Sequence, residues 1–350
     1  MGSGVAAGWD GLAAAARRVL CCGMTELLRI RGLRAVFRTG AGEVAAVDGV
    51  DLSLARGRTL GIVGESGCGK SVLSLSILRL LPEAGRIAAG EVVFEGQDLL
   101  KLSPDAMRAV RGRRIAMVFQ EPMTSLNPVF TVGDQIMEAV RAHDRTLSRA
   151  ELRARAIRAL DRVRIPGAAR RVDDYPHQMS GGMRQRVMIA MALACSPALL
   201  IADEPTTALD VTVQADILAL LREVQAETGM GVVLITHDLG VVAETADEVA
   251  VMYAGRVVER AGCAALFDDP QHPYTIGLLG SVPRIEEVRE RLLAIEGTVP
   301  APFALPRGCR FHPRCVFAAP RCTEVDPPLL PVGAGHGAAC IRAPVEEIAA

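Results

Sequence analysis

Four short and mostly apolar runs of residues predict the strands of a parallel sheet. They occupy residues 59–63, 115–119, 199–202 and 232–236, and each is followed directly by glycine or by polar residues. Apolar runs without alternation are typical of strands that are buried on both faces. Ligands of an open α/β sheet bind beyond the carboxyl ends of its strands. The pattern therefore predicts an α/β fold whose site residues follow these runs.

Other segments alternate between apolar and polar residues. Residues 25–58 and 88–97 do so, with turn residues at 39–42, and together they predict an antiparallel β-subdomain beside the core. Residues 249–252 and 256–259 predict a hairpin that turns at Ala254 and Gly255. After it the chain is rich in proline and glycine.

Between residues 120 and 180 the hydrophobic spacing becomes helical. Leu152, Ala156, Leu160 and Val163 recur at intervals of three or four residues, and residues 285–295 predict a further, charged helix. Arginines crowd the stretch 141–171, which could be a nucleic-acid patch. Because no aromatic residues are interleaved with them, a solvated helix face is the favoured interpretation.

Composition limits the classes of function. The 350 residues are half hydrophobic and the net charge is −1, so no overall field favours nucleic acid or an anionic membrane. The longest uncharged run, residues 187–202, is too short to span a bilayer. Residues 1–23 have arginines after their apolar residues, the reverse of a signal peptide, and we interpret them as a disordered or mis-started extension before Met24. The predicted location is a reducing cytosol.

The sequence GESGCGKS follows the first apolar run and precedes an apolar, helical stretch. This order of strand, glycine-rich loop and helix predicts a phosphate-binding loop rather than a chance match. Glycines let the backbone curl so that its N–H groups and the helix N-terminus face the phosphates. Lys70 is expected to neutralise the β- and γ-phosphates and Ser71 to bind Mg²⁺. Cys68 could be a redox switch, but it is more simply a small residue that contributes its N–H. The predicted phosphate-binding residues are Gly64, Glu65, Ser66, Gly67, Cys68, Gly69, Lys70 and Ser71.

Polar residues at the ends of the other three runs predict hydrolytic chemistry. Asp203 and Glu204 end one run, and we expect Asp203 to hold Mg²⁺ through water and Glu204 to polarise the attacking water. The alternative for this pair is a solvated acidic loop. His237 ends another run and is placed to touch a γ-phosphate, although a lone histidine is often only a satisfied polar residue. Gln120 ends the third.

In order and approximate spacing, the stretches GESGCGKS, MVFQEP, MSGGMRQR, LLIADEPTTALD and LITHD resemble an ABC-transporter ATPase domain. Over roughly residues 25–345 the chain is similar to the ATP-binding subunit of an oligopeptide/dipeptide (peptide/nickel) importer. The resemblance implies a P-loop NTPase with a RecA-like core, an antiparallel β-subdomain and an ABC helical subdomain. It implies an ATPase domain at residues 24–270, with the helical subdomain at about 122–190, and a C-terminal extension at 271–350.

The resemblance also implies roles for single residues. Gln120 matches the glutamine that links Mg²⁺ and the γ-phosphate to the transmembrane subunits, and His237 matches the switch histidine. Phe37 would stack on adenine. Met179 stands where leucine usually precedes the signature, a change of similar volume. The signature residues are Ser180, Gly181 and Gly182, and the D-loop residues are Ala208, Leu209 and Asp210.

The implied function is ATP hydrolysis that powers the import of peptides or a related solute, with Glu204, His237 and Lys70 as catalytic residues. The signature glycines precede a helix and so form a second anion site, yet each chain has one phosphate loop and one signature. The resemblance therefore implies a second ATPase subunit, the same or a sister chain. It further implies two permease subunits that dock near residues 121–127, and indirectly a substrate-binding protein, at the cytoplasmic face of the inner membrane.

Two alternative functions stay open at this point. One is a soluble ABC ATPase that acts on nucleic acid or ribosomes, although the chain has neither a long coiled coil nor a second ATPase domain. The other is a regulatory subunit without catalysis, which the presence of Glu204 and His237 disfavours.

Cys309, Cys315, Cys322 and Cys340 form a C-x5-C-x6-C-x17-C pattern in the extension. A reducing cytosol argues against disulfides, and the tight pairs typical of structural zinc are missing. An iron–sulfur cluster takes four cysteines at varied spacing. The resemblance favours a [4Fe–4S] cluster over Zn²⁺ and over unliganded thiols, and His312 is interpreted as a loop residue.

Overall fold

The structure is a computed structural model that describes residues 25–40, 42–120, 125–207, 209–281 and 295–344. The chain forms two compact units. The first unit contains residues 1–55, 60–97 and 236–350, and the second contains residues 56–59 and 98–235. The predicted extension at 1–23, Ala208, and the charged helix at 285–295 except its last residue lie outside the described residues.

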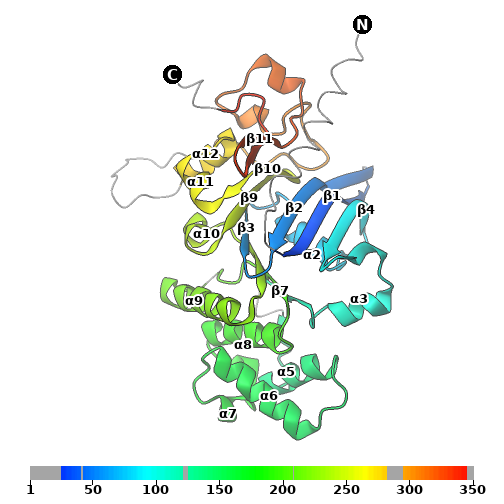
Figure 1. Cartoon of the computed structure of the whole chain (residues 1–350), viewed down its shortest axis with the longest axis vertical. Helices are drawn as coiled ribbons and strands as arrows, with labels where there is room; N and C mark the ends of the chain where they lie inside the picture. Colours follow the sequence, from blue (N-terminus) through cyan, green and yellow to red (C-terminus); the bar gives the residue numbers. More distant parts are fainter. Residues whose placement is uncertain (1–24, 41, 121–124, 208, 282–294, 345–350) are drawn as a thin grey trace. The chain divides into compact units, whose positions relative to one another are not determined.

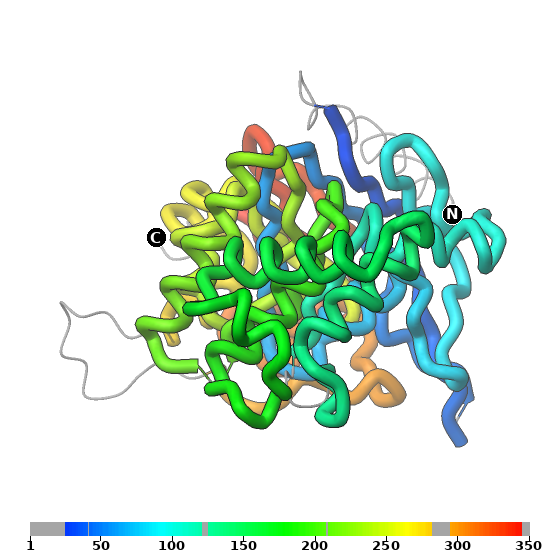
Figure 2. The backbone as a smooth tube through the Cα atoms, turned by 90° about the horizontal axis from the view of Figure 1, so that it is seen from below, coloured from blue at the N-terminus to red at the C-terminus, as the bar shows by residue number. Residues whose placement is uncertain are grey.

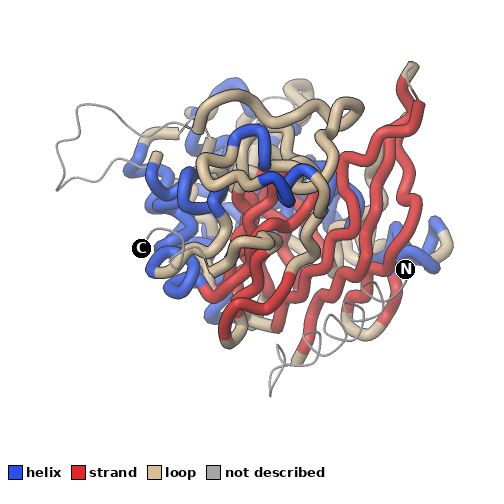
Figure 3. The backbone as a smooth tube through the Cα atoms, turned by 90° about the horizontal axis from the view of Figure 1, so that it is seen from above, coloured by secondary structure: helices blue, strands red, loops and turns tan. Residues whose placement is uncertain are grey.

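An antiparallel sheet forms one layer of the first unit, as the alternating segments predict. Two long strands, β1 (Glu26–Thr39) and β2 (Gly42–Ala55), pair with each other, and β4 (Gly85–Phe94) pairs with the other edge of β1, followed by the short β5 (Gln97–Asp98). Leu28 lies opposite both Leu54 and Phe94, so the apolar positions of the three strands meet on one face. These long strands stand out in Figures 1 and 3.

A second sheet in the first unit runs in the order β11-β12-β10-β9-β3. The buried β3 (Thr59–Val63) is parallel to β9 (Glu248–Tyr253), and β9 turns at Ala254 and Gly255 into β10 (Arg256–Gly262), which confirms the predicted hairpin. Two short strands, β11 (Leu330–Gly333) and β12 (His336–Ala338), extend this sheet from the end of the chain, which the sequence did not predict. The helices of this unit are α2 (Lys70–Ile77), α10 (Leu239–Thr245), α11 (Cys263–Asp268) and α12 (Pro273–Gly280).

The C-terminal extension is mostly loop (Figure 3), with two short 3₁₀ helices, η3 (His312–Arg314) and η4 (Pro320–Thr323). It nevertheless contributes to the core of the first unit. Phe311 is 3% exposed and lies edge-on to the ring of Tyr253, with ring centres 5.2 Å apart. Tyr274, from α12, completes this aromatic cluster. The extension therefore shares one hydrophobic core with β9.

The second unit contains three parallel strands in the order β8-β7-β6. They are β6 (Ile115–Val118), β7 (Leu199–Asp203) and β8 (Gly231–Ile235), and every residue of β7 and β8 is buried. This confirms the strands that the apolar runs predict. The other elements are η1 (Leu99–Lys101), α3 (Pro104–Val110), α5 (Val132–Arg141), α6 (Arg149–Arg162), α7 (Ala168–Arg171), η2 (Pro176–Gln178), α8 (Gly181–Leu193) and α9 (Val211–Thr228).

The helices α5 to α8 form the predicted helical part of the second unit (Figure 2). A capping box of Ser148 and Glu151 starts α6, which buries Leu152, Ala156 and Leu160 as their spacing predicts. Several arginines of this stretch make exposed ion pairs, for example Arg153 with Asp173 and Arg164 with Glu223, as on a solvated helix face. Within the described ranges, no helix combines the length and apolar character needed to cross a membrane.

Candidate functional site

The phosphate loop connects β3 to α2 in the first unit, and its backbone requires glycine. Gly64, Gly67 and Gly69 have φ angles of 149°, 80° and 105°, in the left-handed region. A Cβ atom on Gly64 would lie 2.2 Å from the carbonyl oxygen of Met252, and one on Gly69 would lie 2.4 Å from that of Ala46. The loop is thus tightly packed against its own unit, with Lys70 as the first residue of α2.

Lys70 and Cys68 lie inside this loop, whereas Ser66 and Ser71 are exposed. The ammonium of Lys70, whose residue is 6% exposed, donates to the carbonyl oxygens of Gly64 (2.7 Å) and Glu65 (3.0 Å). Cys68 is fully buried, and burial raises the pKa of its thiol. A protonated, inaccessible thiol is a poor redox switch, so the small-residue interpretation of Cys68 is favoured.

Gln120 and Glu204, 84 residues apart, meet in the second unit. The amide of Gln120 donates to Glu204 Oε2 at 2.9 Å, and the Thr207 hydroxyl donates to the same oxygen at 2.9 Å. Glu204 has a φ of 50°, unusual for a residue other than glycine, and its N–H bonds the carbonyl of Ile235. Such strain is characteristic of functional positions that the surrounding structure holds in place. The preceding residue, Asp203, ends β7 and is 5% exposed.

The signature residues lie at the start of α8 in the second unit. Ser180 is the N-cap, its hydroxyl accepting from the Met183 N–H at 3.3 Å, and Ser180 and Gly181 are exposed. A Cβ atom on Gly182 would lie 2.8 Å from the Val213 side chain. Met179 is 3% exposed, so it fills the apolar position expected of leucine. The helix therefore presents an open N-terminus with its positive dipole end.

The remaining predicted site residues with a described position are Asp210, Phe37 and His237. Asp210 is the N-cap of α9 and accepts from the Val213 N–H at 3.0 Å. In the first unit, Phe37 on β1 is half-buried, and a Cβ atom on Gly85 would lie 2.8 Å from its ring. His237 is exposed and directly precedes Asp238, the N-cap of α10.

The four cysteines of the extension line one small cavity, together with Phe317 and Ile341. They are free thiols, and burial raises the pKa values of Cys309, Cys340 and Cys315, that of Cys315 to about 11. Among the described residues, no group of three or more His, Cys, Asp or Glu side chains is arranged to hold a metal ion. The structure thus gathers the predicted ligands around one cavity without forming a ligand shell.

Sequence reasoning missed two residues that contact the phosphate loop, Tyr274 and Arg314, and a third, Tyr253, whose hydroxyl accepts from Arg314. Arg314 pairs with Glu65, and the Tyr274 hydroxyl accepts from the Glu65 N–H. The only sequence signal was the adjacency of Arg314 to Cys315, which says nothing about the loop.

Two family descriptions match the chain. The ABC transporter family matches residues 47–207, which include the phosphate loop, Gln120, Glu204 and the signature. The oligopeptide/dipeptide transporter C-terminal region matches residues 258–322, which include Tyr274, Arg314 and three of the four cysteines.

Solved structures with this fold include the dimeric ATP-binding cassette MJ0796 in a post-hydrolysis state bound to ADP and Pi. It has a TM-score of 0.62 and 29% identity, and the match covers 68% of this chain and 99% of that one. The cbiO1 protein of Clostridium perfringens, part of the transporter complex cbiONQ, has a TM-score of 0.61 and 28% identity, covering 70% and 92%. These structures confirm the predicted P-loop NTPase fold.

Curated relatives cover nearly the whole chain. A Brucella melitensis protein named as a peptide import ATP-binding protein is 54% identical over 336 residues, 93% of this chain and 98% of its own. A Brucella abortus protein of the same description is 52% identical over 322 residues, covering 92% and 96%. On this similarity, the chain belongs to the ABC-transporter family of ATP-binding proteins, in the class that carries the oligopeptide/dipeptide transporter C-terminal region.

Proposed function

We propose that this protein is the ATP-hydrolysing subunit of an ABC importer and powers the uptake of peptides or a related solute. The observation that carries the proposal is the pairing of Gln120 with Glu204 in a chain that also has a phosphate loop and the C-terminal region of peptide transporters. The alternative of an ATPase that acts on nucleic acid has no support from the matches, and we do not propose it.

In this proposal the phosphates of ATP lie in the loop of residues 64–71. Lys70 would leave the carbonyl oxygens of Gly64 and Glu65 to bind the β- and γ-phosphates. Ser71, Gln120 and Asp203 offer hydroxyl, amide and carboxylate oxygens, the donors that Mg²⁺ prefers, and would hold the ion. When bound, Mg²⁺ would neutralise negative charge on the phosphates.

Glu204 is proposed as the general base for the attacking water. Its carboxylate accepts two hydrogen bonds on Oε2, from Gln120 and Thr207, which orient it. Further proposed contacts are His237 with the γ-phosphate and Phe37 with adenine. Asp210 is proposed to contribute to nucleotide binding across the boundary between two ATPase subunits.

The exposed signature at α8 supports a paired arrangement. We propose that Ser180, Gly181 and Gly182 of one subunit close over ATP in the phosphate loop of a second ATPase subunit. Two permease subunits would receive the motion at the helical part of the second unit, with a substrate-binding protein acting on the far side. This places the chain peripherally at the cytoplasmic face of the inner membrane.

Reconstitution with its two proposed permease subunits tests the proposed function. In proteoliposomes supplied with the binding protein, radiolabelled peptide should accumulate only with ATP on the side of this subunit. Glu204→Gln should abolish the accumulation. Peptide accumulation that is independent of ATP, or hydrolysis that no binding protein or peptide stimulates, would argue against an importer subunit.

For the four cysteines we propose a [4Fe–4S] cluster, with Zn²⁺ as the alternative ligand. Four cysteine thiols around one cavity match the ligand set of such a cluster. The free energy of metal binding to the thiolates would offset the free energy that it costs to bury them. Protein purified without oxygen should contain about four iron atoms per chain, and Cys322→Ser should lose them. The absence of both iron and zinc from such a preparation would end the hypothesis.

A further inference from the structure

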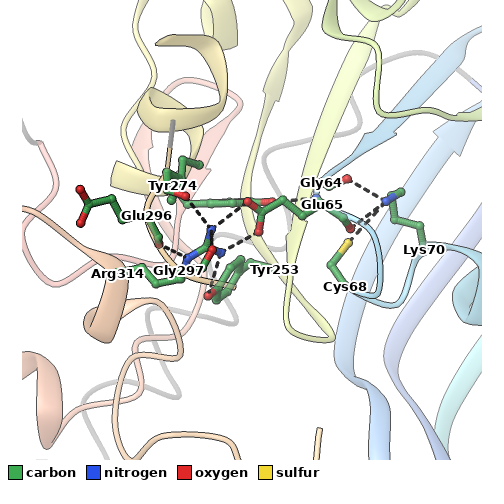
Figure 4. Close-up of polar contacts among 10 residues, drawn as sticks. Gly64, Glu65, Cys68, Lys70, Tyr253, Tyr274, Glu296, Gly297 and Arg314 are labelled. Carbon is green, nitrogen blue, oxygen red and sulfur yellow. Dashed lines mark hydrogen bonds and ion pairs between the residues drawn. The ribbon is translucent and has the colours of Figure 1, made fainter. Parts of the chain in front are cut away.

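The extension holds the phosphate loop through one ion pair inside the first unit. Arg314 Nη1 lies 2.6 Å from Glu65 Oε2, and Arg314 Nη2 lies 2.9 Å from Glu65 Oε1 (Figure 4). This is a bidentate pair, the geometry in which arginine binds a carboxylate most strongly. The Arg314 side chain is 6% exposed and that of Glu65 is 29% exposed. The pair is therefore largely shielded from water.

Arg314 is itself held rigidly. Its Nε donates to the Glu296 carbonyl at 2.8 Å, and Nη2 reaches the carbonyls of Ile295 and Gly297 at 3.3 Å. Its guanidinium also lies 5.8 Å from the ring centre of Tyr253, whose hydroxyl is 3.4 Å from Nη1. A side chain with this many fixed partners cannot follow Glu65 if the loop moves, so it restrains Glu65.

Tyr274 restrains the main chain of the same residue. Its hydroxyl accepts the Glu65 N–H at 2.8 Å, and the side chain is fully buried. Burial raises the pKa of Tyr274 well above its usual range, so the hydroxyl stays neutral. Both the backbone and the side chain of Glu65 are thus fixed by residues outside the loop.

The position of Glu65 matters for Lys70. The Lys70 ammonium donates to the carbonyl oxygens of Gly64 and Glu65, so the first peptide of the loop sets where this charge lies before nucleotide binds. A loop that is preorganised for nucleotide loses less conformational entropy when the nucleotide binds, so it binds the nucleotide more tightly. Freeing Glu65 should therefore weaken nucleotide binding more than it slows the chemical step.

We propose that Arg314 is a positioning residue for nucleotide binding, which acts through Glu65 to hold the phosphate loop in its binding shape. The inference rests on the proposed function, because it takes ATP as the ligand of this loop. It assigns the peptide-transporter C-terminal region a part in the ATP site.

The test uses the full chain in complex with its permeases. Arg314→Ala should raise the KM for MgATP about tenfold, equivalent to about 1.4 kcal/mol, while kcat changes less than about twofold. Arg314→Lys, which keeps the charge but not the bidentate geometry, should give an intermediate KM. Glu65→Gln should resemble Arg314→Ala. The double variant should be no worse than the worse single one, because both remove the same interaction.

Arg342→Ala is the matched control. Arg342 anchors the same cysteine-bearing segment, by donating to the Phe317 carbonyl at 3.0 Å, and has no described contact with the phosphate loop. It should lower the melting temperature without raising the KM. If Arg314→Ala and Arg342→Ala lower the melting temperature alike and leave the KM unchanged, Arg314 is only structural and the inference is overturned.

A second readout does not depend on ATP. Cys68 is fully buried in the loop, so its alkylation rate, followed by mass spectrometry of its peptide, reports loop opening. Arg314→Ala and Glu65→Gln should label Cys68 several-fold faster than wild type and Arg342→Ala. Equal rates in all variants would overturn the inference even with an active ATPase. Faster labelling in a chain whose wild type hydrolyses no ATP would instead refute the proposed function and leave loop positioning supported.

Discussion

At the scale of single residues, Glu204 shows how backbone conformation and hydrogen bonds together orient a side chain of the site. Glu204 has a left-handed backbone and two donors on one carboxylate oxygen, one from Gln120 and one from Thr207. The two donors then hold it in one orientation, as a general base requires.

Replacing Glu204 by Gln tests this assignment. The amide keeps the size of the carboxylate but cannot accept a proton, so hydrolysis should fall by a factor of about 100 to 10,000 while ATP still binds. Phosphate release and size-exclusion chromatography with MgATP measure both effects, and the variant should accumulate as an ATP-loaded dimer. Glu223→Gln is the control, since among the described residues the ion pair of Glu223 is an exposed one with Arg164. Wild-type turnover by Glu204→Gln would rule out Glu204 as the base.

At the scale of secondary-structure elements, one buried carboxylate helps to join the C-terminal extension to the core. Glu259 on β10 is fully buried and accepts from the N–H groups of Gln271 (2.6 Å) and His272 (2.8 Å). It also pairs with His336 Nε2 on β12 at 2.7 Å. One side chain thus holds β10, the start of α12 and β12 together.

Glu259→Ala should therefore cost far more stability than the loss of a surface charge. It leaves two N–H groups and one imidazole buried without their acceptor, which typically costs about 3 to 5 kcal/mol. Urea unfolding of the full chain, followed by circular dichroism, measures the change. Glu223→Ala, which removes only an exposed pair, should cost less than about 1 kcal/mol. Similar midpoints for the two variants would contradict the role of Glu259.

His272 makes this junction sensitive to acid. Burial lowers the pKa of its imidazole to about 4, even though the nearby Glu259 favours the charged form, and Nδ1 accepts the Tyr274 N–H. The unfolded chain binds a proton near pH 6.5, whereas the folded chain does so only near pH 4. The neutral form is thus stabilised in the folded state, and its contribution is present above pH 6.5.

That contribution should be lost as the pH falls from about 6.5 to about 4. The expected decrease in unfolding free energy over this window is on the order of 3 kcal/mol. Urea unfolding at half-unit pH steps measures the slope. His272→Gln should be less stable at pH 7 but show a smaller decrease between pH 6.5 and 4. A wild-type stability that is flat across this window would contradict the assigned pKa.

At the scale of the whole molecule, the sequence has one phosphate loop and one signature, so the proposed function requires two paired subunits for activity. A variant that damages only the signature should therefore lose ATP hydrolysis but keep ATP binding. Ser180 and Ser148 allow a matched comparison, since each is the N-cap of a helix in the second unit and accepts one N–H at 3.3 Å.

Ser180→Ala should destabilise the chain by about 1 kcal/mol, and Ser148→Ala by at least as much, because Ser148 also donates to Glu151 Oε2 at 2.7 Å. Only Ser180→Ala should reduce ATP hydrolysis, by at least tenfold, while equilibrium binding of MgATP to the isolated chain stays within about twofold. Thermal melts, phosphate release and nucleotide titration make the comparison. Equal hydrolysis by the two variants would argue against a signature that completes a partner's site.

The sequence by itself determined the parts that are encoded locally. The phosphate loop, the strands β3, β7 and β8 and the hairpin after β9 follow from contiguous residues, because glycine conformations and apolar runs act over short stretches. The family, and with it the P-loop NTPase fold, followed from motifs of the same kind. The roles of all the predicted site residues remain predictions, since they concern a bound nucleotide.

Only the tertiary structure decided which distant residues meet. Gln120 and Glu204 are 84 residues apart, and Glu65 and Arg314 are 249 residues apart. No periodicity in the chain encodes such pairs, because they depend on how distant segments pack within each unit. The sequence placed four cysteines in the extension, whereas the structure brought them to one cavity and showed that the same segment reaches the phosphate loop.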